Sequence, residues 1–266
     1  MTQPAVAHAP PDLARRFAAT LDRLRADHAL SYLKLGTEAE ALSFEEVALL
    51  RRVVDEHCAS PVRFVGKIGG PDARNDLYQF DLLGVEGFVG PMVESAYGLQ
   101  IYLEAVALMV PSRGPGLPYL GINVETHQAV ANLDAMLAVD GVDRLAFMNV
   151  GRSDLSASVG QRVDDPDVTD MTCEVITKAQ AAGLSGHVGG CVTSTTLAPV
   201  LERVQPDGFH TRFLAFRLEP GAPVDERVGA ALEAELELLE LLAAASEARR
   251  EMHVSRLEVT RKRMGR

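Results

Sequence analysis

Two acidic residues stand directly after short apolar runs, the position where parallel strands end in an α/β protein. Glu125 lies in Gly-Ile-Asn-Val-Glu-Thr, and Asp154 lies in Gly-Arg-Ser-Asp-Leu after the next apolar run. If these runs are successive strands of one parallel barrel, both carboxylates face the same mouth and can bind one ion. Two carboxylates that leave positions for water and substrate suit Mg²⁺ or Mn²⁺. The alternative is structural, because such acids often cap the helix that follows.

Other polar residues follow the remaining apolar runs and extend this chemistry. A divalent ion can chelate a 2-keto acid and stabilise its enolate, while cations hold the oxyanion and a distant carboxylate. His187 is more often a buried structural histidine than a catalyst. The predicted catalytic residues are Lys67, Glu38 and Arg152, and the predicted substrate contacts are Glu94, Ser153, His210 and Arg212.

The elements that must position these residues alternate along the chain. Short apolar runs are expected as strands at 30–35, 62–68, 87–93, 119–124, 144–150, 184–188 and 208–213, with helical patterns between them. This alternation is typical of a parallel sheet wrapped by helices. It predicts a (β/α)8-type TIM barrel, modified at its first strand if anywhere. Seven strands are recognisable, so the eighth is expected to be irregular or replaced by the N-terminal helix over 12–28.

Three segments are expected in the domain organisation. Residues 1–11 contain three prolines and predict a mobile tail, residues 12–227 form the barrel, and residues 228–266 form a helical extension. The extension is rich in Ala, Glu and Leu. It packs either on its own barrel or on a neighbouring subunit, which would make the protein a homo-oligomer.

Composition excludes several classes of protein. The chain has 266 residues, 47% of them hydrophobic, which is enough for a large core. A formal net charge of -11 argues against nucleic-acid and anionic-membrane partners and leaves a small anionic molecule as the expected ligand. Without a secretory or membrane-spanning segment, and with three widely spaced cysteines, the chain is expected to be cytoplasmic.

The same residues resemble a known family. The block Ile122 to Asp143, the block Gly151 to Gly160 and the segment Pro91-Met-Val-Glu-Ser95 are similar to motifs of the HpcH/HpaI aldolase/citrate lyase family. The resemblance covers roughly residues 30–213. It implies a TIM-barrel fold and a divalent metal held by the acids at the positions of Glu125 and Asp154.

This sequence departs from the family pattern at two places. Where family aldolases have a substrate-binding arginine, it has Lys67, which is a point charge without the planar fork of arginine. A desolvated lysine could also form a Schiff base. The family's catalytic histidine has no counterpart, so Glu38 or Glu40 would have to act as the base.

Together these features predict a divalent-metal-dependent carbon-carbon lyase or aldolase for a 2-keto acid. Lys67 would steady the oxyanion, and Arg152 or Arg212 would hold a remote anion. An acyl-CoA is the alternative substrate. Alternatives in other classes are a diverged barrel for hydrolysis, decarboxylation or isomerisation, or a non-catalytic binding subunit.

Overall fold

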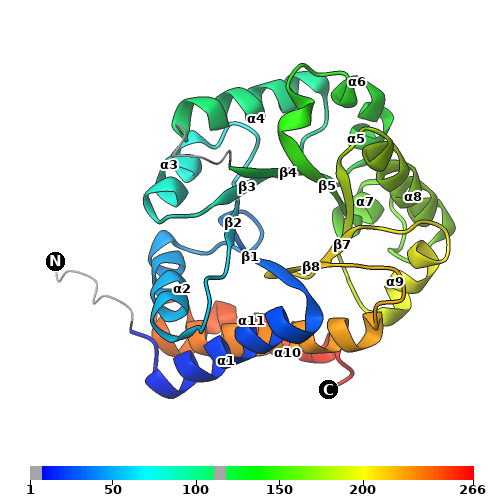
Figure 1. The fold of residues 1–266 in the computed structure, drawn as a ribbon. Coiled ribbons are helices and arrows are strands. Elements are labelled where there is room, and N and C mark those ends of the chain that lie inside the picture. The colour runs from blue at the N-terminus through cyan, green and yellow to red at the C-terminus, as the bar shows by residue number, and fades with distance from the viewer. Residues whose placement is uncertain (1–7, 111–117) are drawn as a thin grey trace.

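Eight strands close into a central barrel with helices around it (Figure 1). The computed structural model describes residues 8–110 and 118–266, so most of the predicted tail over 1–11 lies outside the described residues. The strands are β1 (Leu30–Gly36), β2 (Phe64–Lys67), β3 (Gly87–Gly90), β4 (Tyr119–Val124), β5 (Leu145–Gly151), β6 (Ser185–Gly189), β7 (Gly208–His210) and β8 (Leu214–Arg217). The predicted TIM-barrel class is confirmed.

The outer layer consists of helices whose apolar faces cover the strands. They are α1 (Pro11–His28), α2 (Phe44–His57), α3 (Arg74–Leu82), α4 (Ala96–Met109), α5 (His127–Ala131), α6 (Leu133–Leu137), α7 (Arg152–Ser158), α8 (Pro166–Ala181), α9 (Ser194–Leu201), α10 (Val224–Ala245) and α11 (Arg250–Arg263). A capping box starts α2, because Ser43 accepts from the backbone N–H of Glu46 and the Glu46 carboxylate accepts from that of Ser43. In the described residues no helix has the length and apolarity needed to cross a bilayer.

The eighth strand corrects the expectation from sequence. No helix replaces it, and its irregularity is one of direction and register, with a shift in its pairing between Leu30 and Tyr32 of β1. The chain turns at residues 211–213 directly after β7, and β8 pairs antiparallel with both β7 and β1. The apolar run expected as one strand over 208–213 is therefore the start of a tight hairpin. Because β7 ends at the mouth of the barrel, this turn lies at the mouth and β8 leads away from it.

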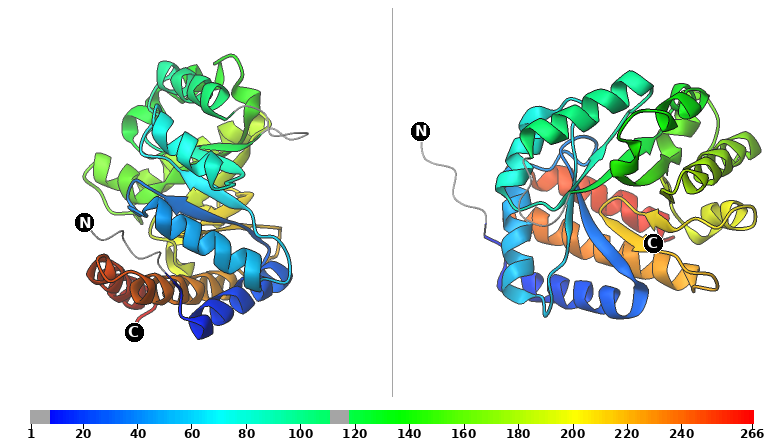
Figure 2. Two further views of the ribbon diagram at one scale, coloured as in Figure 1. Left: turned by 90° about the vertical axis from the view of Figure 1, so that its left-hand side faces the viewer. Right: turned by 45° about the horizontal axis from the view of Figure 1, so that its top comes forward.

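The C-terminal segment forms two helices. α10 buries an apolar face that includes Ala231, Leu238 and Leu242, and it packs beside α1. α11 folds back along α10, as the ion pairs Arg261–Glu240 and Arg266–Glu233 show. Both helices lie with α1 on one side of the barrel (Figures 1 and 2). α10 begins inside the range predicted for the barrel, and the proposed domain division stays a prediction.

Candidate active site

A polar cavity of about 200 Å³ opens at the carboxyl ends of the parallel strands. It gathers six of the residues predicted from sequence, together with residues from α10 and α11 that were not predicted. The predicted residues that line it are Lys67, Glu125, Ser153, Asp154, His210 and Arg212; further lining residues are Lys34, Glu40, Asn123, Cys191, Leu232 and Arg263. The mouth of the barrel is therefore where the chemistry is concentrated.

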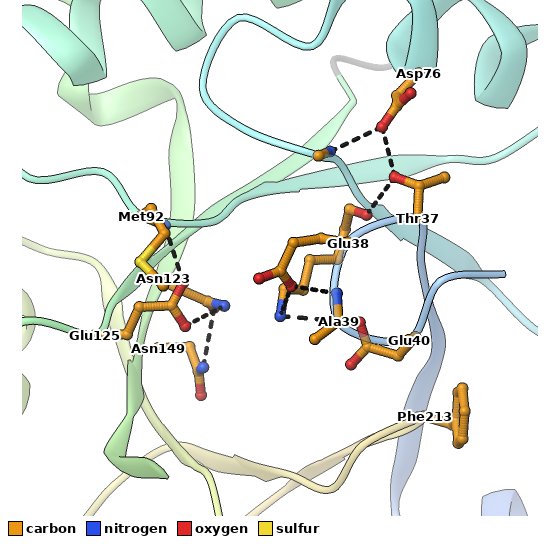
Figure 3. Close-up of polar contacts among 12 residues, drawn as sticks. Thr37, Glu38, Ala39, Glu40, Asp76, Met92, Asn123, Glu125, Asn149 and Phe213 are labelled. Carbon is orange, nitrogen blue, oxygen red and sulfur yellow. Dashed lines mark hydrogen bonds and ion pairs between the residues drawn. The ribbon is translucent and has the colours of Figure 1, made fainter. Parts of the chain in front are cut away.

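The Glu125 carboxylate is held by neutral donors and is only 2% exposed. Its Oε1 accepts from the backbone N–H of Met92 at 2.9 Å, and its Oε2 accepts from Asn123 Nδ2 at 3.1 Å (Figure 3). Asn149 in turn donates to Asn123 Oδ1 at 3.0 Å. Each carboxylate oxygen keeps a lone pair for a further ligand. Glu125 does not cap the next helix, because the N-cap of α5 is Thr126.

Asp154 lies in the first turn of α7 and is exposed at the cavity. Within the described residues its carboxylate has no hydrogen bond or ion pair. Burial raises the pKa of Glu125 above its usual range, and the charge of Asp154 adds to that rise. Burial and the charges of Glu38 and Glu40 likewise raise the pKa of Asp154. The charge of Lys67 lowers the pKa of both carboxyls but does not offset these effects, so a further cation would stabilise their charged forms.

These two carboxylates fit a hard divalent cation. They line one cavity, raise no steric conflict with each other and leave most coordination positions to water and substrate. No group of three or more His, Cys, Asp or Glu residues arranged for a metal occurs among the described residues, so the protein would supply two ligands at most from this set. The buried Asn149 Oδ1 also has no hydrogen-bond partner, but Asn149 is not part of the cavity lining.

Lys67 supplies the positive charge of this part of the cavity. Its Nζ lies 2.5 Å from Glu38 Oε2 and 3.8 Å from Glu40 Oε2. Burial alone lowers the pKa of Lys67, but the charges of Glu40 and Glu125 and the hydrogen bond to Glu38 raise it above the usual value. Lys67 is therefore an ammonium ion. In that state it can donate to an oxyanion, whereas a Schiff base requires the neutral amine.

The acidic loop after β1 holds Lys67 in place. Burial raises the pKa of Glu38, but the hydrogen bonds from Lys67 and from the backbone of Ala39 outweigh that effect and lower it. Glu40 is 4% exposed, and its Oε2 is buried without a hydrogen-bond partner. Glu40 lines the cavity, whereas Glu38 is behind Lys67 and is not part of the lining. Figure 3 shows this loop on one side and Glu125 on the other.

His210 belongs to a hydrogen-bonded group at the floor of the cavity. Its Nε2 lies 2.9 Å from both Tyr32 Oη and His187 Nδ1, and its own Nδ1 is buried without a partner. Burial and the neighbouring charges of His187 and Lys34 lower the pKa of His210 well below its usual value. The ring is therefore neutral, and His210 contributes to the lining of the cavity.

Two predicted site residues lie away from the cavity. Arg152 is 1% exposed, and its guanidinium donates to the backbone carbonyls of Gly189, Gly190 and Thr196. It joins the end of β5 to the loop after β6. Glu94 accepts a hydrogen bond from Thr126 Oγ1 at 2.6 Å and thereby fixes the start of α5.

The sequence matches one family over most of the region that carries these residues. The HpcH/HpaI aldolase/citrate lyase family matches residues 46–188, which is more than half of the chain. The chain belongs to this family. The resemblance inferred from the motifs is confirmed, and membership supports a lyase or aldolase kind of enzyme. No curated protein matches the sequence.

Several solved structures share the fold of this chain. An HpcH/HpaI aldolase from Desulfitobacterium hafniense DCB-2 has a TM-score of 0.56 at 21% identity and covers 70% of this chain and 79% of its own. An HpcH/HpaI aldolase/citrate lyase family protein from Burkholderia cenocepacia J2315 has a TM-score of 0.58 at 15% identity, with coverage of 84% and 91%. The citrate synthase SbnG has a TM-score of 0.55 at 17% identity, with coverage of 73% and 81%. At these identities the likeness establishes the fold.

Proposed function

We propose that this protein is a divalent-metal-dependent carbon-carbon lyase or aldolase that acts on a 2-keto acid. The observation that carries the proposal is the cavity in which Glu125, Asp154 and the charged Lys67 meet. Glu125 and Asp154 would hold Mg²⁺ or Mn²⁺. When bound, the ion would supply Lewis acidity that favours the enolate of the keto acid over its neutral form.

The protein's own groups would divide the remaining work. The ammonium of Lys67 would donate to the developing oxyanion, and its pairing with Glu38 would keep it protonated and directed. The base is Glu38 or Glu40. Glu40 lines the cavity, and its Oε2 has only a long ion pair to Lys67 and no hydrogen bond, which favours Glu40 as the group that removes the proton, with Glu38 as the anchor of Lys67.

The other predicted site residues have narrower proposed roles. Ser153 and His210 line the cavity and would donate hydrogen bonds to substrate oxygens, and Arg212 would hold a remote anion. Arg152 would position the loop after β6, to which its guanidinium donates hydrogen bonds. Glu94 would position the start of α5 through its hydrogen bond from Thr126. A cytoplasmic location and a homo-oligomeric state are part of the same proposal.

Calorimetric titration of Mn²⁺ tests the metal site directly. Wild type should bind one ion per chain, and oxalate, a mimic of the pyruvate enolate, should tighten binding. Glu125→Gln and Asp154→Asn should each lose most of the affinity. Glu94→Gln is the matched control, since it is another strand-end acid but lies outside the cavity, and it should bind like wild type.

The outcome separates the competing functions. Absence of Mn²⁺ binding to wild type would refute the metal-dependent reaction. Binding that oxalate does not tighten would instead favour a non-catalytic subunit or another metal-assisted reaction. If oxalate does tighten binding, steady-state assays with keto acids and with acyl-CoA esters distinguish the two substrate classes.

A further inference from the structure

Three arginines near the cavity have no carboxylate partner among the described residues. Arg212 lies in the turn between β7 and β8, and Arg256 and Arg263 lie on α11. Three other arginines around α11 have carboxylate partners, namely Arg249 with Glu46, Arg261 with Glu240 and Arg266 with Glu233, whereas Arg250 donates to the backbone carbonyl of Ala243. Arg212 and Arg263 both line the cavity, so a ligand bound there can reach both charges.

The geometry of α11 directs two of these arginines to one side. Arg256 and Arg263 are seven residues apart, which is about two helical turns, so they lie on the same face. Arg263 lines the cavity together with Arg212. Arg256 reaches the loop after β1, where its Nη2 donates to the backbone carbonyl of Ala39 at 3.0 Å. Its Nη1 is buried without a hydrogen-bond partner.

The charges around this cluster do not neutralise it. Burial lowers the pKa of Arg256 and the charge of Arg212 lowers it further, while the charges of Glu40 and Glu46 raise it without offsetting these effects. The acids nearby have other partners. Glu46 accepts from Arg249 and His253, Glu235 accepts from the backbone N–H of Phe213, and Glu40 has its ion pair with Lys67. An anion between the arginines would relieve the repulsion.

The cluster lies across the barrel from the two acids. Glu125 and Asp154 follow β4 and β5, whereas Arg212 precedes β8 and α11 contacts the loop after β1. In a closed barrel of eight strands, β4 lies opposite β8 and β5 lies opposite β1. The cavity therefore has an acidic end, where Lys67 is the cation, and a separate arginine end.

We propose that Arg212 and Arg263, with Arg256 behind them, bind a second anionic group of the substrate, so that the substrate is a keto acid with an anion at each end. This inference rests on the proposed function for the placement of the keto-acid end. The second group is a carboxylate or a phosphate-like group, since arginine pairs with either. α11 thus sets the substrate class.

Binding of matched keto acids to the Mn²⁺-loaded protein tests this. The probes are 2-oxoglutarate, 2-oxopentanoate with the same carbon chain but no second carboxylate, and 2-oxo-4-phosphonobutanoate with a phosphonate in its place. Wild type should bind a dianionic probe about tenfold or more tightly than 2-oxopentanoate, because charge-assisted hydrogen bonds are strong. Whether the carboxylate or the phosphonate binds more tightly identifies the natural group.

Two variants test whether the preference for dianionic probes depends on Arg212 and Arg263. Arg212→Gln and Arg263→Gln should remove the preference for dianions and leave the affinity for 2-oxopentanoate and oxalate unchanged. Arg261→Gln is the matched control on the same helix, because Arg261 is paired with Glu240 on the surface, and it should retain the preference. Equal affinity of wild type for all three probes would overturn the proposal while the proposed function stands.

A second measurement covers the case in which the metal site fails. If wild type binds neither Mn²⁺ nor the keto acids, the midpoint of thermal unfolding of the metal-free protein is measured with inorganic phosphate. A rise in wild type that is lost in Arg263→Gln supports the arginine site and rejects only the proposed function. No rise in wild type rejects both.

Discussion

Replacing Lys67 by methionine tests the electrostatic account of the cavity most directly. The substitution keeps the length of the side chain but leaves Glu38, Glu40 and Glu125 without their nearest cation. Lys67 is 5% exposed and Glu40 is 4% exposed, so little water can replace the lost charge. Breaking a buried ion pair from one side costs about 3 to 5 kcal/mol. For a chain of this size that lowers the midpoint of thermal unfolding by about 6 to 20 °C.

The stability that Lys67→Met loses should be greater at high pH than at low pH. The pKa of Glu125 and that of Asp154 are already raised in the folded protein, and removal of Lys67 raises them further. Carboxyls with a raised folded-state pKa favour the folded state when protonated and disfavour it as pH rises through that pKa. The destabilisation of Lys67→Met should therefore be large at pH 7 and become smaller toward pH 5.

Mn²⁺ should restore part of the lost stability, because a divalent ion at Glu125 and Asp154 replaces the missing charge. At a free concentration one hundred times the dissociation constant, binding stabilises the folded state by about 2.7 kcal/mol. The assay is urea unfolding followed by circular dichroism at pH 7 and pH 5, with and without Mn²⁺. Lys178→Met is the control, because Lys178 pairs with Asp134 and Glu174 on the surface, where water screens the charges, and its replacement should leave stability nearly unchanged. A Lys67→Met protein as stable as wild type at pH 7 would refute the reasoning.

Three further predictions concern the groups around the site. Arg152→Met leaves the carbonyls of the loop after β6 without a donor and should cost on the order of 3 kcal/mol in urea unfolding, with kcat reduced at saturating Mn²⁺. Gly190→Ala should cost more than about 1 kcal/mol by the same assay, because φ is +77° and the new Cβ would lie 2.4 Å from the backbone nitrogen of Ser153. Burial raises the pKa of Glu46, but hydrogen bonds from His253 and Ser43 outweigh burial and lower that pKa. Glu46 therefore stabilises the fold above about pH 4.3, and this contribution is lost as pH falls through the folded-state pKa. Glu46→Gln should thus be less stable than wild type at pH 7, and the difference should shrink below pH 4.

The acidic end of the cavity could be predicted because it follows a local rule. Lys67 ends β2, Glu125 directly follows β4, and Asp154 comes three residues after β5, and parallel strands bring their carboxyl ends together. The same rule does not place Glu94 and Arg152 in the cavity lining. A residue that follows a strand can turn toward the neighbouring helix or loop, and the direction depends on partners such as Thr126 and Thr196 that are distant in sequence.

The arginine end could not be predicted, because it depends on contacts between distant parts of the chain. Arg263 follows β8 by more than forty residues in a basic stretch that looks like an ordinary solvated helix end. Its place at the cavity depends on the way α11 folds back along α10 and on the anchoring of Arg249 and His253 at Glu46. No periodicity in the sequence specifies such an angle between two helices.

The reversed strand β8 explains why a C-terminal helix can take part in the site. In a regular barrel the last strand ends at the mouth and its helix leads the chain away to the opposite end. Here β8 starts at the mouth and ends at the opposite end, so α10 returns the chain, and Leu232 of α10 already lines the cavity. The next helix, α11, then starts beside the loop after β1 and carries Arg263 to the cavity. One antiparallel strand thus changes which end of the barrel the last helix reaches. Variation in α11 can therefore alter the substrate without any change in the acids that would bind the metal.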